Sequence, residues 1–243
     1  MISIIIPTYN EEEVIASTLN SLTQKVKTKH EILVVDDSSD STELVVKKYA
    51  RRHKNIKFVK NNPEKKGFAL SIKKGIKESK YPVVVVVMGD LCDDPNTIDK
   101  MYKRINSGYD VVCGSRYMKG GKKSGGPKVQ HFLSLFVCTT LHHLTGIPTT
   151  DPSNAYKMYK KTALKGVKFN PASGVEASIE TIFQVYFKGV KITEVPTSWT
   201  GRTKGDSKFR IFQRAPKYAQ IYKWALIHSL KIRLGLTPGR FYA

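Results

Sequence analysis

The sequence predicts an α/β fold with a mostly parallel central sheet covered by helices on both faces. Short apolar runs alternate with helical segments, joined by short links, and this alternation is typical of parallel sheets. Residues 83–87 are five consecutive valines. A run so short and so uniformly β-branched indicates a strand buried on both faces, at the centre of the sheet.

The apolar pattern also predicts where the individual elements lie. Strands are expected at 2–6, 31–35, 56–59, 83–87, 110–113 and 190–195, with one more following the turn that begins at residue 151. Helices are expected from Glu11 to about 24, at 42–53, 68–79, 95–107, 128–145 and 174–188, and as final helices over about 208–234. The glycine- and lysine-rich segment 119–128 is expected to be a mobile basic loop. A GxGxxG motif is missing, which disfavours a standard dinucleotide-binding fold.

The charge balance predicts an anionic partner. The chain has 41 Lys and Arg against 20 Asp and Glu, a net charge of +21. Nucleic acid, an acidic membrane surface or a phosphorylated substrate would each suit this surplus. The distribution is uneven: fourteen acids lie within residues 1–100, whereas residues 207–243 hold eight Lys and Arg and no acid. The two ends of the chain therefore differ in electrostatic character.

The cysteines and the hydropathy pattern predict a cytoplasmic protein. The three cysteines (Cys92, Cys113 and Cys138) are odd in number and form no CxxC pair, which indicates a reducing compartment. Met1 leads directly into strand-like residues, so no signal peptide is expected. No run of 18 apolar residues occurs, so we expect no membrane span, although the chain could lie on a membrane.

Carboxylates follow three of the predicted strands. Glu11 follows the first, Asp36 and Asp37 the second, and Asp90 the central valine run, with Asp93 close behind. Open α/β sheets bind ligands at the carboxyl ends of their strands. Asp36 and Asp37 come too early to cap the next helix, and could accept hydrogen bonds from a base N–H or a ribose hydroxyl. Asp90 could hold a divalent cation on a diphosphate, whereas Asp94, just before Pro95, is expected to cap the following helix.

Basic residues follow in the second half of the chain. Arg116, Arg202 and Lys208 suit a further phosphate. The final helices mix aromatic and aliphatic residues with cations, which is typical either of a helix resting on acidic lipid or of a basic helix packed on its own domain. Transfer of a sugar from a nucleotide-sugar to an anionic acceptor would use both the carboxylates and the cations.

Five motifs, in order, resemble those of family 2 glycosyltransferases. The segments 4–11 (IIIPTYNE), 34–42 (VVDDSSDST) and 114–117 (GSRY) resemble the family as a whole. The segments 151–156 (DPSNAY) and 202–208 (RTKGDSK) are similar to the polyprenol-phosphate branch, which includes dolichol-phosphate mannose synthase. The resemblance covers roughly residues 1–210.

This resemblance implies a GT-A fold, inversion at the anomeric carbon, a divalent metal (Mg²⁺ or Mn²⁺), a GDP- or UDP-linked sugar donor and a polyprenyl phosphate acceptor. It implies one domain with a nucleotide-binding half (1–115), an acceptor half (116–210) and interfacial C-terminal helices (211–243). Asp90, Arg116 and Arg202 would be catalytic, and Arg116, Arg202, Lys208 and Ser153 would bind acceptor or phosphate. The implied nucleoside contacts are Pro7, Tyr9, Glu11, Asp36 and Asp37.

The sequence departs from the family pattern at the metal motif and at the acceptor motif. The family's Asp-x-Asp is Met88-Gly89-Asp90 here, and its usual Gln is Cys92. Metal binding is therefore expected to depend on Asp90 together with Asp93. The family's Ser-Gly-Phe-Arg is the segment 153–156 (SNAY), so the choice of acceptor or sugar could differ. No membrane spans follow at the C-terminus, so we expect peripheral attachment to the cytoplasmic face of an anionic membrane.

Two alternatives stay open at this point. A polyprenyl phosphate is already a nucleophile near neutral pH and requires no strong base, but a saccharide hydroxyl would require one. Asp151, which lies between two prolines, is either a turn former or a functional carboxylate, and is the best candidate for that base. A nucleic-acid binder is the remote alternative, and it is disfavoured because the cations are not interleaved with base-stacking aromatics in a known module. We therefore expect no nucleic acid among the partners.

Overall fold

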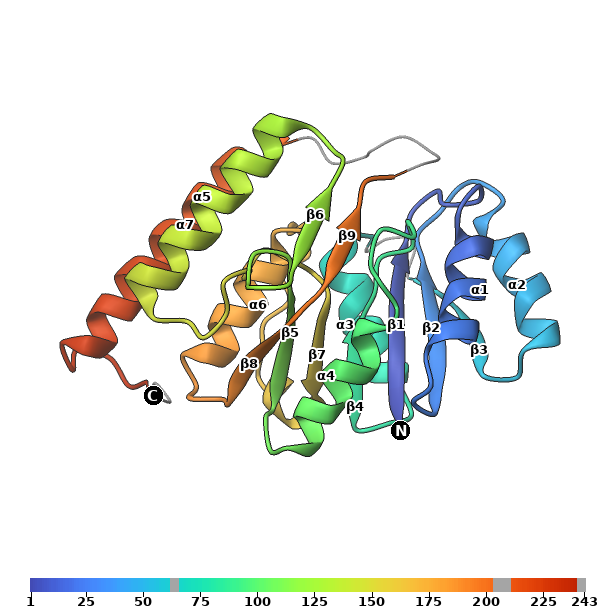
Figure 1. Ribbon diagram of the computed structural model, residues 1–243, viewed down its shortest axis with the longest axis horizontal. Coiled ribbons are helices and arrows are strands. Elements are labelled where there is room, and N and C mark those ends of the chain that lie inside the picture. Colours follow the sequence, from blue (N-terminus) through green and yellow to red (C-terminus); the bar gives the residue numbers. More distant parts are fainter. Residues whose placement is uncertain (62–65, 203–210, 240–243) are drawn as a thin grey trace.

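The computed structural model describes residues 1–61, 66–202 and 211–239, and one seven-stranded sheet runs through it (Figure 1). The strand order is β3-β2-β1-β4-β7-β5-β8, and all neighbours are parallel except β7, which is antiparallel to both β4 and β5. The predicted mostly parallel α/β sheet is confirmed, although the reversed direction of β7 was not foreseen. The strands are β1 (Ile2–Thr8), β2 (His30–Asp36), β3 (Ile56–Lys60), β4 (Val83–Val86), β5 (Val111–Ser115), β7 (Lys157–Lys160) and β8 (Ile192–Pro196).

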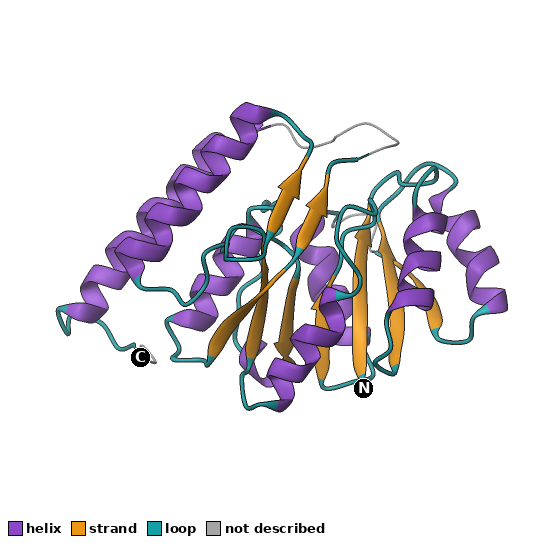
Figure 2. Cartoon of the chain, viewed as in Figure 1, coloured by secondary structure: helices purple, strands orange, loops and turns teal. Residues whose placement is uncertain are grey.

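Helices cover both faces of this sheet (Figure 2). They are α1 (Ile15–Lys25), α2 (Thr42–Arg52), α3 (Phe68–Glu78), α4 (Thr97–Asn106), α5 (Lys128–Thr145), α6 (Ala177–Tyr186) and α7 (Ile211–Arg233), with a 3-10 turn at Lys161–Leu164. Ile4 and Val85 belong to the core beneath α1, α2 and α4, whereas Ile5 and Val84 belong to the core on the other face, to which α3, α5, α6 and α7 contribute. Because alternate side chains of β1 and β4 enter opposite cores, both strands are buried on both faces, as the valine run predicted.

The first helix begins later than the sequence suggested. Glu11 to Glu13 were expected to form its first turn, but α1 starts at Ile15. Asn10 adopts a left-handed conformation (φ 53°), and the backbone N–H of Glu11 donates to Thr42 Oγ1 at 2.9 Å. That of Glu12 donates to Asp40 Oδ2 at 3.2 Å. The segment is therefore bound to the β2–α2 loop, which places Glu11 at the edge of the sheet.

The basic segment 119–128 is not wholly a loop. Its residues Lys122–Ser124 form β6, which pairs with β9 (Ser198–Thr200) in a separate two-stranded sheet. The prediction of a mobile loop was wrong here because the partner strand lies about 75 residues away and glycine-rich composition reports only local preference. The C-terminal region also differs, since a single helix α7 takes the place of several and continues through Pro216.

Helices α5 and α7 lie side by side, run in the same direction and project from one end of the sheet (Figure 1). Ser229 Oγ on α7 donates to the Thr145 carbonyl at the end of α5. The outer faces of both helices carry exposed large apolar side chains: Val129, Phe132, Leu133, Leu135, Phe136 and Leu144 on α5, and Ile227 and Leu230 on α7. No helix within the described ranges is both long and apolar enough to cross a bilayer.

Candidate active site

The carboxyl ends of β1, β2 and β4 bring the predicted carboxylates to one edge of the sheet. Asp36 is the last residue of β2 and pairs in register with Thr8 at the end of β1. Pro7 is buried within β1, whereas the Tyr9 ring just beyond it is 53% exposed. A proline-fixed strand end next to an accessible aromatic ring suits a flat ligand such as a nucleobase.

Asp36 is held by hydroxyl groups on one of its two oxygens. Oδ1 accepts from Thr8 Oγ1 at 2.8 Å and from Ser38 Oγ at 2.5 Å. Oδ2 is buried and has no hydrogen-bond partner among the described residues. Because a buried acceptor without a partner is costly, such an oxygen in a native site calls for a donor from outside the chain.

Asp37 repeats this arrangement with a different set of neighbours. Its Oδ2 accepts from the Gly67 backbone N–H (2.9 Å), Ser71 Oγ (2.9 Å) and Asn61 Nδ2 (3.3 Å). Its Oδ1 is buried without a partner in the described part of the chain. The start of α3 therefore orients Asp37. The sequence carried no signal for Gly67, Ser71 or Asn61 in this role, because their side chains and loops meet Asp37 only in the folded sheet.

Arg202 joins two of the carboxylates that the sequence analysis assigned to different ligands. Its Nη2 and Nη1 donate to Glu11 Oε1 and Oε2 at 2.6 and 3.0 Å, and its Nε lies 3.4 Å from Asp90 Oδ2. Glu11 is thus bound to the cation that was expected to hold phosphate. An arriving diphosphate would compete with Glu11 and Asp90 for this guanidinium.

Backbone pairing places Arg202 beside Asp90. The Thr200 N–H donates to the Cys92 carbonyl at 3.0 Å, and the Asp94 N–H donates to the Ser198 carbonyl at 3.2 Å. Strand β9 therefore binds the acidic loop directly. Asp94 Oδ1 accepts from the backbone N–H of Asn96 at 3.1 Å, and the Asp94 carbonyl accepts from the Thr97 N–H. Asp94 therefore caps the turn that leads into α4, although the helix itself begins at Thr97, two residues later than predicted.

Asp90 and Asp93 fit a divalent cation by charge and by type of ligand. Asp93 is buried, and burial together with the nearby Asp90 carboxylate raises the pKa of Asp93 to about 7. Two hard oxygen donors whose charges repel suit Mg²⁺ or Mn²⁺. No cluster of three or more His, Cys, Asp or Glu able to hold a metal occurs in the described residues. A cation here would therefore take its other ligands from phosphate and water.

Arg116 and Asp151 form a buried ion pair. Arg116 Nε and Nη2 donate to Asp151 Oδ2 and Oδ1 at 2.7 and 2.9 Å, and the Arg116 backbone N–H adds a third bond of 3.0 Å. Burial opposes ionisation of Asp151, but the Arg116 guanidinium outweighs it and holds the pKa of Asp151 below its ordinary value. A fully buried carboxylate with a lowered pKa is a poor proton acceptor, so the geometry argues against Asp151 as a base.

The apolar helix α5 contributes polar groups to this pair. Ser153 Oγ accepts from Arg116 Nη2 at 3.0 Å and lies 3.2 Å from Cys138 Sγ and 3.3 Å from Ser134 Oγ, both on α5. Tyr117 also donates to Ser134 at 2.9 Å. The predicted residues Arg116, Ser153 and Asp151 are therefore brought together, while Lys208 lies outside the described residues. Ser134 and Cys138 were missed, because small polar residues in an apolar helix look unremarkable in sequence. Tyr117 stood in the motif 114–117, but its contact with Ser134 could not be seen there.

With this geometry in place, comparison with known proteins identifies the class. Residues 3–167 match the model of glycosyl transferase family 2, well over half of the chain. The chain therefore belongs to this family and is a glycosyltransferase. The resemblance found in the sequence motifs is confirmed.

Individual proteins similar to this chain include polyprenyl-phosphate glycosyltransferases. A dolichol-phosphate mannosyltransferase of Pyrococcus furiosus is 30% identical over 92% of this chain, which spans 64% of that relative's length. An undecaprenyl-phosphate mannosyltransferase of Micrococcus luteus is 27% identical over 96% of this chain and 98% of its own. Among solved structures, glucosyl-3-phosphoglycerate synthase of Mycobacterium tuberculosis, crystallised with Mn²⁺ and UDP, matches with a TM-score of 0.66 at 18% identity, covering 98% of this chain and 81% of its own. This structural match supports the GT-A fold.

Proposed function

We propose that this enzyme transfers a sugar from a nucleoside-diphosphate sugar to a polyprenyl phosphate at a membrane surface, with inversion at the anomeric carbon. One observation supports a lipid acceptor in particular. Helix α5, whose outer face exposes large apolar side chains, also contributes Ser134 and Cys138 to the cluster around Arg116. The same helix could therefore lie on lipid and border the site of an anionic head group. The names of the two polyprenyl-phosphate relatives support this acceptor.

The donor would bind over β1 and β2. The unpartnered oxygens of Asp36 and Asp37 can accept from base N–H or ribose hydroxyl groups, and Tyr9 can stack on the base. Pro7 would fix the strand end beneath it. Glu11 binds Arg202 in this structure. Its proposed contribution is therefore to position that cation, in addition to any contact with the nucleoside.

The diphosphate would lie between Asp90 and Arg202. A divalent metal held by Asp90 and Asp93 would supply positive charge against the leaving diphosphate. Arg202, and by the family resemblance Lys208, would add cationic hydrogen-bond donors on the same group. These donors stabilise charge that develops as the bond between the anomeric carbon and the diphosphate breaks.

The acceptor phosphate would approach from the side of Arg116 and Ser153. One of its oxygens attacks the anomeric carbon as the nucleoside diphosphate departs, and no proton has to be removed from a phosphate that is already ionised. The buried Arg116–Asp151 pair supports this scheme, since Asp151 is committed to fixing the guanidinium. A saccharide hydroxyl acceptor would need a base, and Asp151, the candidate that the sequence offered, is bound to Arg116 through both of its oxygens.

The membrane contact would be made by α5 and α7. Both helices expose apolar side chains, and α7 also carries several Lys and Arg and no acid, which suits an anionic surface. We place the enzyme peripherally, on the cytoplasmic face.

The test is a transfer assay with the full chain. UDP- and GDP-linked hexoses are each supplied with polyprenyl phosphate and Mg²⁺ or Mn²⁺, and lipid-linked sugar is extracted and its anomeric configuration determined. A glycolipid of inverted configuration is expected from at least one donor. Asp90→Asn should abolish it, whereas Asp99→Asn, which removes a charge from α4 away from this edge, should not. Transfer to free saccharides but never to the lipid would overturn the proposal.

A further inference from the structure

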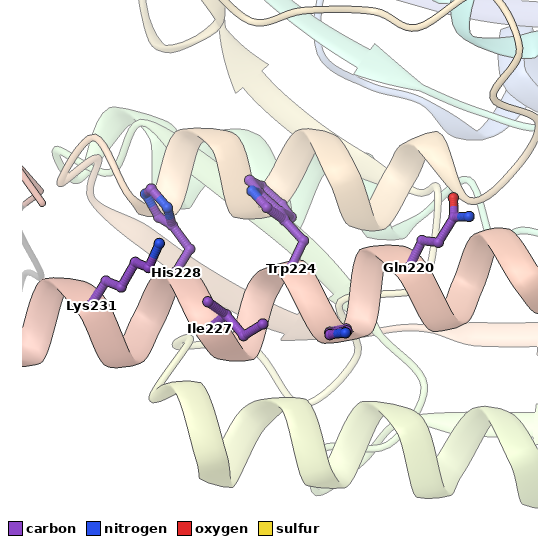
Figure 3. A pocket seen from close by; sticks show the side chains of 6 residues that line it. Gln220, Trp224, Ile227, His228 and Lys231 are labelled. Carbon is purple, nitrogen blue, oxygen red and sulfur yellow. The ribbon is translucent and has the colours of Figure 1, made fainter.

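A shallow groove of about 310 Å³ runs along α7, apart from the candidate active site. Its lining residues are Gln220, Lys223, Trp224, Ile227, His228 and Lys231. Figure 3 shows that Gln220, Trp224, His228 and Lys231 line one flank of the helix. The volume is at the lower end of the range of small-molecule pockets, about 300–1,000 Å³, so the groove suits a compact group better than a long chain.

The walls of this groove are fixed by packing. The Trp224 and His228 rings lie 5.5 and 4.5 Å from the ring of Phe187, just beyond α6, and 6.0 Å from each other in a stacked arrangement. Between them along the helix, Ala225 is fully buried. The groove is thus a formed feature, and little ordering would be required of the protein when a ligand enters it.

The groove is cationic and its charges are uncompensated. Lys223 and Lys231 lie two turns apart, about 12 Å along the helix axis, and neither forms an ion pair with any described residue. No acid occurs in the sequence after Asp206. The site therefore favours an anion.

The groove also borders the apolar outer face of α7. Ile227 lines the groove and is 43% exposed, and Leu230, one turn further along, is 57% exposed. A ligand in the groove would thus have lysines and an indole on one side and an apolar surface on the other. Tryptophan and lysine side chains gather at this depth of a bilayer, where lipid phosphates lie.

We propose that this groove binds the phosphate head group of an anionic phospholipid, at a site separate from the acceptor's. The proposal rests on the membrane-surface part of the proposed function. The phospholipid's acyl chains would lie along the exposed face of α5 and α7, and its phosphate between Lys223 and Lys231. Docking would then depend on the charge of the bilayer, and α7 would be held in one orientation on it.

The test measures binding of the full chain to vesicles that contain no polyprenyl phosphate, so its outcome does not depend on whether transfer occurs. Wild type should bind vesicles of phosphatidylcholine with phosphatidylglycerol more tightly than vesicles of phosphatidylcholine alone. The double variant Lys223→Gln with Lys231→Gln should bind the vesicles that contain phosphatidylglycerol about 30-fold more weakly, at about 1 kcal/mol per lysine near an anionic surface. Its binding to vesicles of phosphatidylcholine alone should be unchanged. Thermal melting checks that the variant is folded.

The matched control is Lys48→Gln with Lys54→Gln. These two exposed lysines lie in and just after α2, at the opposite end of the molecule (Figure 1), and removing them should change binding little because salt screens charges beyond about 8 Å. An equal loss in the control would show a diffuse charge effect and overturn the proposal. Release of the wild type by inorganic phosphate at the head-group concentration would also overturn it, by identifying a site for free phosphate. Transfer to detergent-dispersed polyprenyl phosphate should be the same in both variants.

Discussion

The buried carboxylates on the two sides of the sheet edge differ in how many of their oxygens have hydrogen-bond partners. On the β1–β2 side, Asp36 and Asp37 each have one oxygen held by the protein and one without a partner among the described residues. On the β5 side, both oxygens of Asp151 are bound by Arg116. Burial alone therefore does not distinguish the two sides. The unfilled hydrogen-bonding capacity of Asp36 and Asp37 does, and it is the reason we propose them as ligand-binding residues.

The difference has an energetic meaning. A buried acceptor without a partner costs about 1–3 kcal/mol, so each of these two oxygens is a reserve of binding energy for a donor ligand. The Arg116–Asp151 pair holds no such reserve, and its contribution is to fix a guanidinium in place. We expect substitutions on the first side to weaken ligand binding, and on the second side to weaken the fold.

The largest expected effect is on stability, from Asp151→Ala. The substitution leaves Arg116 buried without its counter-ion, which costs about 3–5 kcal/mol. Urea unfolding should show this as a lower midpoint. Glu43→Ala, which breaks the exposed pairs of Glu43 with Lys47 and Lys60, should cost under about 1 kcal/mol for each pair. Similar losses in the two variants would mean that the buried pair is not what holds this side together.

Asp37→Asn should act on the donor. The asparagine oxygen can still accept from Gly67 and Ser71, but its amide would present N–H groups where Oδ1 had been an acceptor. Losing a hydrogen bond to a charged group, about 1.5–3 kcal/mol, corresponds to roughly 10- to 150-fold weaker binding of UDP or GDP by calorimetry. Ser71→Ala serves as a control for the support of Asp37, and should lose less. Unchanged nucleotide affinity in Asp37→Asn would remove this residue from the donor site.

The sequence brought together the residues proposed for the donor better than those proposed for the acceptor, for a physical reason. Asp36, Asp37 and Asp90 follow strands whose apolar runs are strong local signals, and the carboxyl ends of parallel strands meet at one edge whatever the details. The pairing of β6 with β9 and the approach of α5 to Ser153 join segments far apart in sequence, and nothing local specifies them. Even so, Arg116 and Asp151 were both singled out, because each lies in a short motif of its own, 114–117 and 151–156.

What the sequence could not supply was the partner of each charged group. Arg202 and Glu11 were assigned to phosphate and nucleoside, yet they lie 2.6 Å apart, because β9 is bound to the acidic loop. Asp151 was a candidate base until its bonds to Arg116 were visible. Charges are read easily from a sequence, whereas their pairing depends on tertiary contacts.

Glu31, on β2, tests whether a buried carboxylate outside the proposed donor site has its hydrogen-bonding capacity filled by the protein. Burial opposes its ionisation, but hydrogen bonds from Ser3 Oγ, the Lys80 backbone and Lys57 Nζ outweigh it and hold the pKa of Glu31 below its ordinary value. A lowered folded-state pKa contributes stability that is present above the unfolded value and lost as pH falls through the folded one. Glu31→Gln should therefore cost about 1 kcal/mol at neutral pH, and the gap to wild type should close below about pH 4. A gap that is constant with pH would contradict this.

The smallest expected effect on stability comes from the exposed face of α5, where Phe132 is 67% exposed. Because its ring is mostly in water, Phe132→Ser should change the free energy of unfolding by no more than about 0.5 kcal/mol. The same change should weaken binding to anionic vesicles, since burying a phenylalanine in a bilayer is worth about 1.5–3 kcal/mol. Phe183 lies on the buried face of α6 and contacts Trp224 of α7. Phe183→Ser should therefore destabilise the fold strongly. If Phe132→Ser lowered stability as much as a core substitution, α5 would be covered by protein in solution, and its outer face would not be the membrane contact.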